Sequence, residues 1–167
     1  TLVVNPHAPS GQLTPLEQLR ELAEAVPGVL LIDEAYVDFV DPAQNYDSSS
    51  LLNERDNVLI MRTFSKGYSL AGMRLGYLLG AANLIKPIIE KTRDSYNIDA
   101  LSQAIGLAAI QDQAYAESTW SAVRGLRDAL YAALLQRGFG GPSSQTNFLF
   151  MDVPATGPSA LAIYQSC

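Results

Sequence analysis

The sequence predicts an α/β protein in which helices flank a mostly parallel sheet. Two runs of consecutive apolar residues, 29–32 and 58–61, each end in polar residues. Such runs are typical of parallel strands that are covered on both faces. A segment with apolar residues at helical spacing, 16–26, lies between a first apolar run at 2–4 and the run at 29–32. This alternation of strand and helix favours a parallel sheet.

The first strand and the first helix have clear boundaries. Leu2–Val4 is short, rich in β-branched residues, and runs into turn residues at Asn5-Pro6. The segment Thr14-Pro-Leu-Glu17 predicts a helix start, with the threonine as N-cap, the proline at the first helical position and the glutamate three residues after the cap. Pro27-Gly28 is expected to end this helix.

The second half of the chain is mostly helical. Met73–Leu79 is a candidate for one more strand, and Asn147–Val153 predicts another. Gly138 stands where a helix C-cap is expected. Three segments between the two candidate strands have helical periodicity: 83–93, 99–111 and 115–137. We therefore expect a domain boundary within the helical region, with a smaller α/β domain that begins near its end.

Composition and charge exclude several classes of protein. Of the 167 residues, 48% are hydrophobic and 17% are charged, which is typical of a globular protein. The net charge of −6 is dispersed and argues against nucleic-acid binding, because phosphate neutralisation needs clustered cations. No apolar stretch approaches the ~20 residues that span a bilayer. The single cysteine, Cys167, cannot form an internal disulfide, so we expect a cytoplasmic protein.

Both ends of the sequence predict a fragment of a longer protein. The chain opens on Thr1 inside an apolar run, without an initiator methionine. It closes within the segment 160–167, which has the pattern of an interrupted helix. A metal site is not expected, because His7 is the only histidine and no cysteine cluster accompanies it.

Polar residues follow the ends of the three predicted parallel strands. These strands end at Asn5, Asp33 and Thr63, and ligands of open α/β sheets bind outside the carboxyl ends of the strands. The residues expected to converge there are Asn5, His7, Asp33, Tyr36, Thr63, Ser65, Lys66 and Arg74.

This set has a distinct chemical capacity. A lysine becomes a nucleophile in a partly desolvated, electropositive setting, and Arg74 follows Lys66 closely. A carboxylate such as Asp33 keeps a ring nitrogen protonated, and small hydroxyls beside an arginine form a phosphate cup. Carboxylate, lysine and phosphate cup together are what bound pyridoxal phosphate requires. The alternatives are structural: Asp33 capping a turn, loop hydroxyls bonding local backbone, and Arg74 in a surface ion pair.

Three segments carry a resemblance to a known family. They are Asn5-Pro-His-Ala-Pro-Ser-Gly11, Asp33-Glu-Ala-Tyr-Val-Asp-Phe39 and Arg62-Thr-Phe-Ser-Lys-Gly-Tyr-Ser-Leu-Ala-Gly-Met-Arg-Leu-Gly-Tyr77. With these segments the chain resembles the fold-type-I pyridoxal-phosphate-dependent aminotransferases, and within them the histidinol-phosphate aminotransferase group. The weaker landmarks Asp94-Ser-Tyr-Asn97 and Thr146-Asn-Phe-Leu149 extend the resemblance over nearly the whole chain.

The resemblance implies a role for each candidate residue. Lys66 would form the Schiff base with pyridoxal phosphate and shuttle the proton of the substrate α-carbon. Asp33 would pair with the pyridine nitrogen, and Tyr36 would bond the ring phenolic oxygen. The phosphate would be held by Thr63, Ser65 and Arg74.

One position departs from the family pattern. The residue before Pro9 is often an asparagine that contacts the phenolic oxygen, and here it is Ala8. Asn5 and His7 are the candidates for replacing this contact, unless Tyr36 makes it alone. Asn147 is a candidate for the substrate region, with a structural turn as the alternative.

The resemblance also implies a domain plan and an incomplete site. Residues 1–110 would be the C-terminal part of the cofactor-binding large domain, and 111–167 the interdomain helix and the beginning of the small domain. The family's N-terminal half supplies further cofactor contacts, and its substrate-carboxylate arginine would follow Asn147, yet no arginine follows Arg137. We therefore expect this polypeptide alone to have no appreciable transaminase activity.

The expected reaction of the intact protein is amino transfer between histidinol phosphate and 2-oxoglutarate, in histidine biosynthesis. The alternatives are an aromatic aminotransferase, a threonine-phosphate decarboxylase on the same fold, or a non-catalytic fragment. The family further implies a homodimer.

Overall fold

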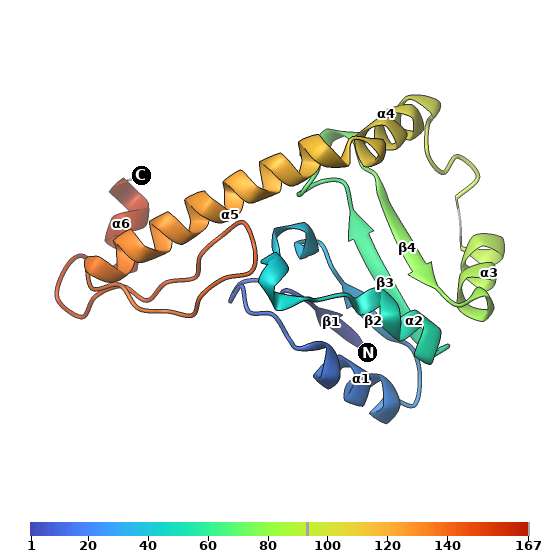
Figure 1. Ribbon diagram of the computed structural model, residues 1–167, viewed down its shortest axis with the longest axis horizontal. Helices are drawn as coiled ribbons and strands as arrows, with labels where there is room; N and C mark the ends of the chain where they lie inside the picture. The colour runs from blue at the N-terminus through green and yellow to red at the C-terminus, as the bar shows by residue number, and fades with distance from the viewer. Residues whose placement is uncertain (93, 167) are drawn as a thin grey trace.

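A four-stranded mixed sheet forms the centre of the computed structural model, which describes residues 1–92 and 94–166 (Figure 1). The strands, which lie in sequence order, are β1 (Leu2–Val4), β2 (Leu30–Asp33), β3 (Val58–Thr63) and β4 (Gly76–Gly80). β1, β2 and β3 are parallel, and β4 pairs antiparallel with β3. The predicted α/β fold with a mostly parallel sheet is confirmed.

In the described residues, six α-helices accompany the sheet: α1 (Leu16–Ala25), α2 (Leu51–Glu54), α3 (Ala82–Lys91), α4 (Ala100–Gln111), α5 (Gln113–Gln136) and α6 (Ala160–Ser166). The loops contain four short 3₁₀ turns: η1 (Val37–Phe39), η2 (Pro42–Gln44), η3 (Ser48–Ser50) and η4 (Ala71–Met73). None of the helices in the described ranges is long and apolar enough to cross a membrane.

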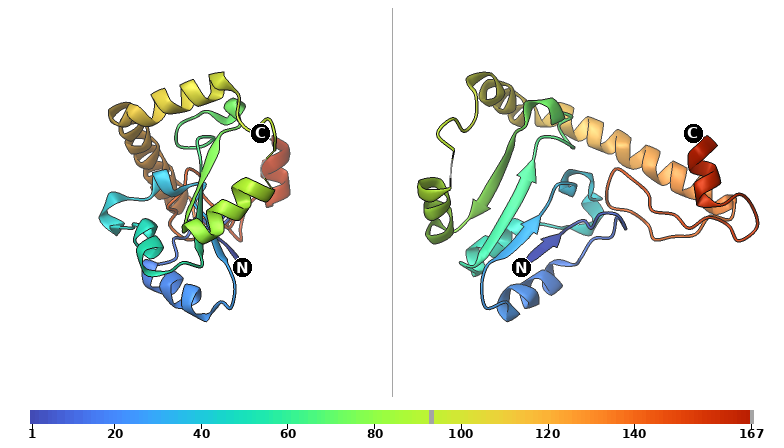
Figure 2. Two further views of the ribbon diagram at one scale, coloured as in Figure 1. Left: turned by 90° about the vertical axis from the view of Figure 1, so that its right-hand side faces the viewer. Right: turned by 180° about the vertical axis from the view of Figure 1, so that it is seen from behind.

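The core lies on one face of the sheet. Its fully or almost fully buried members are Leu19, Ala23, Leu30, Ile32, Leu51, Val58 and Ile60. Alternate residues of β2 and β3 thus point toward α1 and α2, as the period of two along a strand dictates. The prediction of strands covered on both faces is met only in part: on the opposite face of β3, Leu59 is 7% exposed, but Met61 is 37% exposed. Figure 2 shows α1 and α2 together on the covered face, while α5 runs past the strand ends.

Helix boundaries match the predicted ones closely, with one wrong cap. α1 begins one residue after Pro15, and its start has no side-chain cap. Thr14, the predicted N-cap, instead bonds Asn5 through its backbone: Thr14 N–H donates to Asn5 Oδ1 (2.7 Å), and Thr14 O accepts from Asn5 Nδ2 (3.1 Å).

The end of α5 follows the prediction. Gly138 has a φ of +82°, and the N–H groups of Gly138 and Phe139 donate to the carbonyls of Leu135 and Leu134. This pattern is a Schellman motif, in which glycine relieves the strain of the left-handed conformation. Arg93 and Cys167, the last residues of two predicted helical segments, lie outside the described residues.

Two strand predictions changed. The candidate strand Met73–Leu79 begins only at Gly76, because the turn η4 occupies residues 71–73. The strand predicted at Asn147–Val153 is wrong: within the described ranges this segment pairs only through an isolated bridge between Gly140 and Asp152. Residues 148–151 form a continuous apolar run with side chains to bury, but a strand also needs a neighbouring strand for its backbone groups.

Candidate active site

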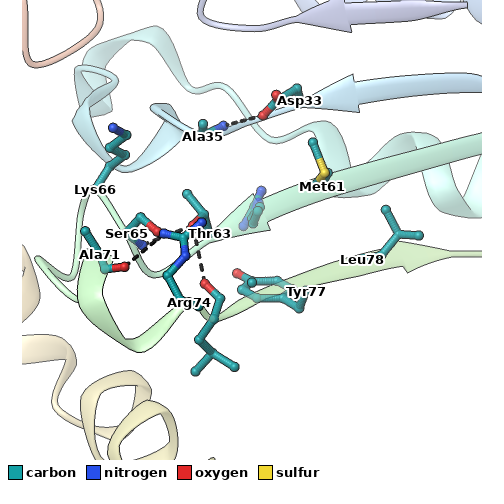
Figure 3. Close-up of a pocket in the computed structure, with 13 residues that line it drawn as sticks. Asp33, Ala35, Met61, Thr63, Ser65, Lys66, Ala71, Arg74, Tyr77 and Leu78 are labelled. Atoms are coloured by element: carbon teal, nitrogen blue, oxygen red, sulfur yellow. Dashed lines mark hydrogen bonds between the residues drawn. The ribbon is translucent and has the colours of Figure 1, made fainter. Parts of the chain in front are cut away.

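A pocket of about 660 Å³ lies where β2 and β3 end (Figure 3). This volume lies in the range of small-molecule sites. Its lining includes five of the predicted site residues: Asp33, Thr63, Ser65, Lys66 and Arg74. The structure therefore brings the carboxylate, the lysine and the expected phosphate cup to one cavity.

Lys66 stands in the loop that joins β3 to β4, and its side chain is exposed. Its Nζ lies 5.8 Å from the centroid of the Tyr36 ring, over the ring face. Among the described residues, Lys66 Nζ has no hydrogen bond and no ion pair. The amine is therefore accessible to a ligand in the pocket.

Asp33 is the last residue of β2 and combines two roles. Its Oδ1 accepts a hydrogen bond from the Ala35 N–H at 3.1 Å. One carboxylate oxygen of Asp33 therefore caps the turn, as the structural alternative predicted. Oδ2 has no hydrogen-bond donor in the described part of the chain. The capped turn fixes the orientation of the carboxylate and leaves this second oxygen for a ligand.

The three residues of the expected phosphate cup differ in how many of their polar atoms already have hydrogen-bond partners in the protein. Thr63 Oγ1 accepts from the Ser65 N–H (3.0 Å) and donates to Leu75 O (3.3 Å), so this hydroxyl shapes the loop. Ser65 Oγ bonds no group in the described ranges. Arg74 donates through Nη1 to Ala71 O at 2.9 Å, which leaves its other guanidinium donors for an anion.

Arg74 has a left-handed backbone. Its φ is +50°, and Ser69 in the same loop has a φ of +57°. Non-glycine residues adopt this region at a cost, and such strain concentrates at functional sites. The loop between β3 and β4 thus holds Arg74 in an orientation that the surrounding chain enforces.

Tyr36 is adjacent to the pocket but does not line it. Its ring faces Lys66 Nζ on one side and meets the Phe148 ring edge-on, with centroids 5.0 Å apart. Tyr36 therefore lies between the Lys66 loop and the segment around Phe148.

Asn5, His7 and Asn147 are not brought into this pocket. The side chain of Asn5 is fully buried and bonds Thr14 and Tyr46. His7 is exposed, and its Nδ1 lies 2.9 Å from Ser10 Oγ. Asn147 lines a separate hollow on α5.

A buried carboxylate next to the pocket was missed by sequence analysis. Glu34 is 1% exposed and receives hydrogen bonds from Arg62 Nε (2.8 Å), Tyr46 Oη (2.8 Å) and Ser48 Oγ. Asn5 Nδ2 donates to Tyr46 Oη at 2.9 Å, so the network reaches from β1 to β3. It explains why Asn5 turns away from the pocket.

The network shifts two ionisation equilibria. Burial, reinforced by the negative charge of Glu34, raises the pKa of Tyr46. Burial lowers the pKa of Arg62, but the charge and hydrogen bond of Glu34 outweigh it, and the net shift is upward. Both groups therefore keep their protons at neutral pH. The only sequence signal was an acidic residue following Asp33 at the end of an apolar run.

Asp38 lies against the loop that carries Lys66. A Cβ atom at Gly67 would approach Asp38 Oδ2 to 2.1 Å, so the loop is in close contact with this carboxylate. Burial raises the pKa of Asp38 to about 6, and the positive charge of Arg62 opposes the shift.

Arg62 and Tyr77 also line the pocket, and neither was predicted as a site residue. They face each other across the antiparallel pair of β3 and β4. The pairing direction of β4 was the missing information, because it decides which residues of Gly76–Gly80 reach the cavity.

Known proteins resemble this chain over most of its length. The family model of aminotransferase class I and II matches residues 2–166. Histidinol-phosphate aminotransferase 1 of Nostoc sp. is 43% identical over 154 residues, which are 92% of this chain and 42% of that protein. The histidinol-phosphate aminotransferase of Geobacter sulfurreducens is 39% identical over 152 residues, or 91% and 42% of the two chains.

Solved structures share the fold. A putative histidinol-phosphate aminotransferase from Erwinia carotovora atroseptica aligns with a TM-score of 0.81 at 26% identity, over 90% of this chain and 44% of its own. The Sinorhizobium meliloti enzyme, determined in complex with pyridoxal-5'-phosphate, gives 0.78 at 28% identity, over 87% and 40%. The chain thus spans less than half the length of the relatives it matches. From the family match over residues 2–166, this chain belongs to the class I and II aminotransferases.

Proposed function

We propose that the protein containing this chain is a pyridoxal-phosphate-dependent aminotransferase in which Lys66 forms the Schiff base. The observation that carries the proposal is the convergence of Lys66, Asp33 and Arg74 on one pocket of about 660 Å³. An accessible amine, a fixed carboxylate and an anion-binding end suit the aldehyde, the ring nitrogen and the phosphate of one ligand. The chain's family and the pyridoxal phosphate in the S. meliloti relative support this assignment.

The residues present fit this cofactor, and each has a task. Bound pyridoxal phosphate supplies an electron sink for the bonds of the substrate α-carbon. Asp33 Oδ2 would keep a proton on the ring nitrogen, and Tyr36, which adjoins the pocket, would bond the phenolic oxygen of the ring. Ser65 and Arg74 would hold the phosphate, with Thr63 shaping their loop. Lys66 Nζ would hold the aldehyde and, as a free amine, would take up and return the proton of the substrate α-carbon.

We further propose histidinol phosphate as amino donor and 2-oxoglutarate as acceptor, in cytoplasmic histidine biosynthesis. The names of the relatives at about 40% identity support this choice. A decarboxylase from Sulfurospirillum multivorans shares the fold at 26% identity, so decarboxylation stays an alternative, as does transamination of aromatic amino acids. The intact protein is proposed to be a homodimer, with residues 1–110 in the large domain and 111–167 leading into the small one.

The first test is an absorbance titration of the intact protein with pyridoxal phosphate. The chain has three lysines, Lys66, Lys86 and Lys91, and Lys86 is an exposed residue of α3. A saturable visible band is expected in the unaltered protein and in Lys86→Ala, and is expected to be absent in Lys66→Ala. After borohydride reduction, mass spectrometry should locate the label on Lys66. Label on another lysine would contradict the assignment.

The isolated chain is proposed to be inactive. It spans 42% of the Nostoc relative, and the remainder of such a protein would complete the site. Assay of the 167-residue polypeptide beside the intact protein tests this directly. Comparable turnover by both would overturn the proposal of inactivity, while a visible band without turnover would identify the chain as a cofactor-binding fragment.

A further inference from the structure

Among the described residues, four side chains along α5 donate hydrogen bonds to backbone carbonyls of segments that are distant in the sequence; Gln113, at the start of the helix, donates to Ile110 O in the adjoining α4. The four are Trp120, Arg124, Arg127 and Tyr131. Their spacing of four, three and four residues, at 100° per residue, places them within an arc of about 60° on the helix surface. We call these four residues the donor stripe. Figure 1 shows α5 as the long helix that runs past the end of β3 toward the loops of the C-terminal segment.

The first half of the donor stripe contacts the Lys66 loop and the turn after Tyr36. Trp120 Nε1 donates to Gly67 O at 2.8 Å, one residue after Lys66. Arg124 Nη1 donates to Asp38 O at 3.4 Å, in the turn η1 that follows Tyr36. One face of α5 thus bonds the backbone next to Lys66 and the backbone of the turn that follows Tyr36. These are the two segments that bring the Lys66 amine and the Tyr36 ring together.

The second half of the stripe anchors the same helix to the C-terminal segment. Arg127 is 6% exposed, and its Nη1 donates to Phe39 O (3.1 Å) and Thr146 O (3.2 Å). Tyr131 Oη donates to Gly141 O at 2.9 Å. Because α5 is one rigid element, its bonds to η1 and to residues 141–146 fix the position from which it holds the Lys66 loop.

We propose that the donor stripe of α5 positions Lys66 against Tyr36, and that Trp120 is the residue that fixes the Lys66 loop. Its relevance to cofactor binding rests on the function proposed above. The contacts on both sides of Gly67 support this role. Asp38 packs against Gly67, and the Tyr68 ring meets the Trp120 ring edge-on, with centroids 5.4 Å apart. The loop is therefore enclosed between η1 and α5.

The proposal assigns the hold on the Lys66 loop to the hydrogen bond of the indole N–H and not to the packing of the ring. Trp120→Phe keeps an aromatic ring against Tyr68 but leaves Gly67 O without its donor. Tyr115→Phe is the matched control, because Tyr115 is an exposed aromatic residue of the same helix whose hydroxyl bonds no described group. Both variants lose one polar hydrogen, and only the first loses a bond to the Lys66 loop.

Amide hydrogen exchange of the intact protein without cofactor is the first measurement. The N–H groups of Ser69 and Leu70 donate to Lys66 O and Phe64 O, so their exchange reports opening of the loop. We expect exchange at these two amides to be about fivefold faster in Trp120→Phe and unchanged in Tyr115→Phe, as the loss of one net hydrogen bond predicts. Equal exchange in both variants would overturn the proposal.

The second measurement is the affinity for pyridoxal phosphate and the pH at which the visible band of the bound cofactor changes. Trp120→Phe is expected to bind about fivefold more weakly and to shift that pH, since both depend on where Lys66 and Tyr36 stand. A fall in melting temperature with unchanged affinity and unchanged band would mean a merely structural role, and would refute the proposal. If the unaltered protein binds no pyridoxal phosphate, the proposed function fails, while the exchange experiment still decides the role of Trp120.

A second variant keeps the test decisive if Trp120→Phe does not fold. Arg124→Met is expected to accelerate exchange at Phe39 and Val40, whose N–H groups close the turn η1, and to leave Ser69 and Leu70 unchanged. It should shift the pH response of the cofactor band as well, because Tyr36 begins that turn. A uniform increase of exchange along the chain, with no shift of the band, would argue against positioning by the stripe.

Discussion

Glu34 and Arg62 form an ion pair that joins the ends of the two strands from which the site is built. Arg62 Nε lies 2.8 Å from Glu34 Oε2, and the side chains are 26% and 0% exposed, respectively. Glu34 follows Asp33, and Arg62 precedes Thr63. The pair therefore fixes the separation between the carboxylate of β2 and the loop that begins after β3.

Arg62→Met is expected to destabilise the protein strongly. Glu34 would keep its bonds from Tyr46 and Ser48 but would lose its counter-charge inside the protein. Breaking a buried pair in this way lowers the free energy of unfolding by about 3–5 kcal/mol. Urea denaturation of the intact protein, followed by circular dichroism, measures the change.

The control for this variant is a more exposed ion pair between the end of α2 and the helix α1. Arg55 and Glu24 lie 3.0 Å apart with side chains 36% and 70% exposed. Arg55→Met should therefore lower the free energy of unfolding by less than about 1 kcal/mol. Equal losses for the two arginines would mean that the Glu34 pair has no special role.

Asp38 is expected to make stability fall as the pH rises. Its pKa is about 6 in the folded state, against 3.8 for the free side chain. Between these values the folded state binds more protons than the unfolded state, so the free energy of unfolding decreases from pH ~4 to pH ~6 and then levels off. The contribution is roughly 2–3 kcal/mol, at 1.36 kcal/mol per pKa unit.

Asp38→Asn isolates this contribution, because the amide has nearly the same shape and does not titrate. At neutral pH the variant should be more stable than the unaltered protein, and the difference should shrink as the pH falls toward 4. Unfolding free energies measured over this range give the difference curve. Parallel curves for the two proteins would show that Asp38 is not the titrating group.

The shared pocket was predictable because its residues follow strand ends. Asp33 ends one apolar run, Thr63 ends the next, and Ser65, Lys66 and Arg74 follow within one loop. Parallel strands deliver such residues to one edge of the sheet, whatever the details of packing. Knowledge of the strand order was not needed for this part of the site.

Other features of the site and of the fold could not be predicted, because they depend on tertiary contacts that no sequence pattern encodes. Asn5 also follows a strand end, but its side chain completes the network around Glu34 through Tyr46. Tyr46 stands in the segment 40–50, which has neither helical nor strand periodicity, so its contact with Glu34 was not foreseeable. The strand prediction for Asn147–Val153 was wrong for the same reason, because an apolar run in the sequence does not show whether a neighbouring strand is available to pair with it.

Gly67→Ala is expected to weaken cofactor binding. The added Cβ would lie 2.1 Å from Asp38 Oδ2 and 2.7 Å from Asp38 Cβ, so the Lys66 loop must move away from η1. Overpacking of this kind costs about 1–3 kcal/mol. We expect the dissociation constant for pyridoxal phosphate, measured by absorbance titration, to rise about tenfold.

Gly72→Ala is the matched control, since nothing lies within 4 Å of a Cβ at that position in the same loop. Its affinity for pyridoxal phosphate should stay within about twofold of the unaltered protein. The double variant Gly67→Ala with Asp38→Ala should recover part of the lost affinity, because it removes the clashing carboxylate. If the double variant binds no better than Gly67→Ala, the clash with Asp38 is not the cause.

Arg74→Ala separates recognition of the phosphate from formation of the bond to Lys66. Arg74 keeps guanidinium donors beyond its bond to Ala71 O, and the loop holds it in a left-handed conformation beside Ser65. Charge-assisted hydrogen bonds contribute about 1.5–3 kcal/mol, so affinity for pyridoxal phosphate should fall roughly 10- to 100-fold. Pyridoxal, which lacks the phosphate, provides the control within each protein: its affinity, measured by the same absorbance titration, should be unchanged by the substitution. An equal loss for both ligands would mean that Arg74 supports the loop as a whole, and the phosphate would then have to be assigned to other donors.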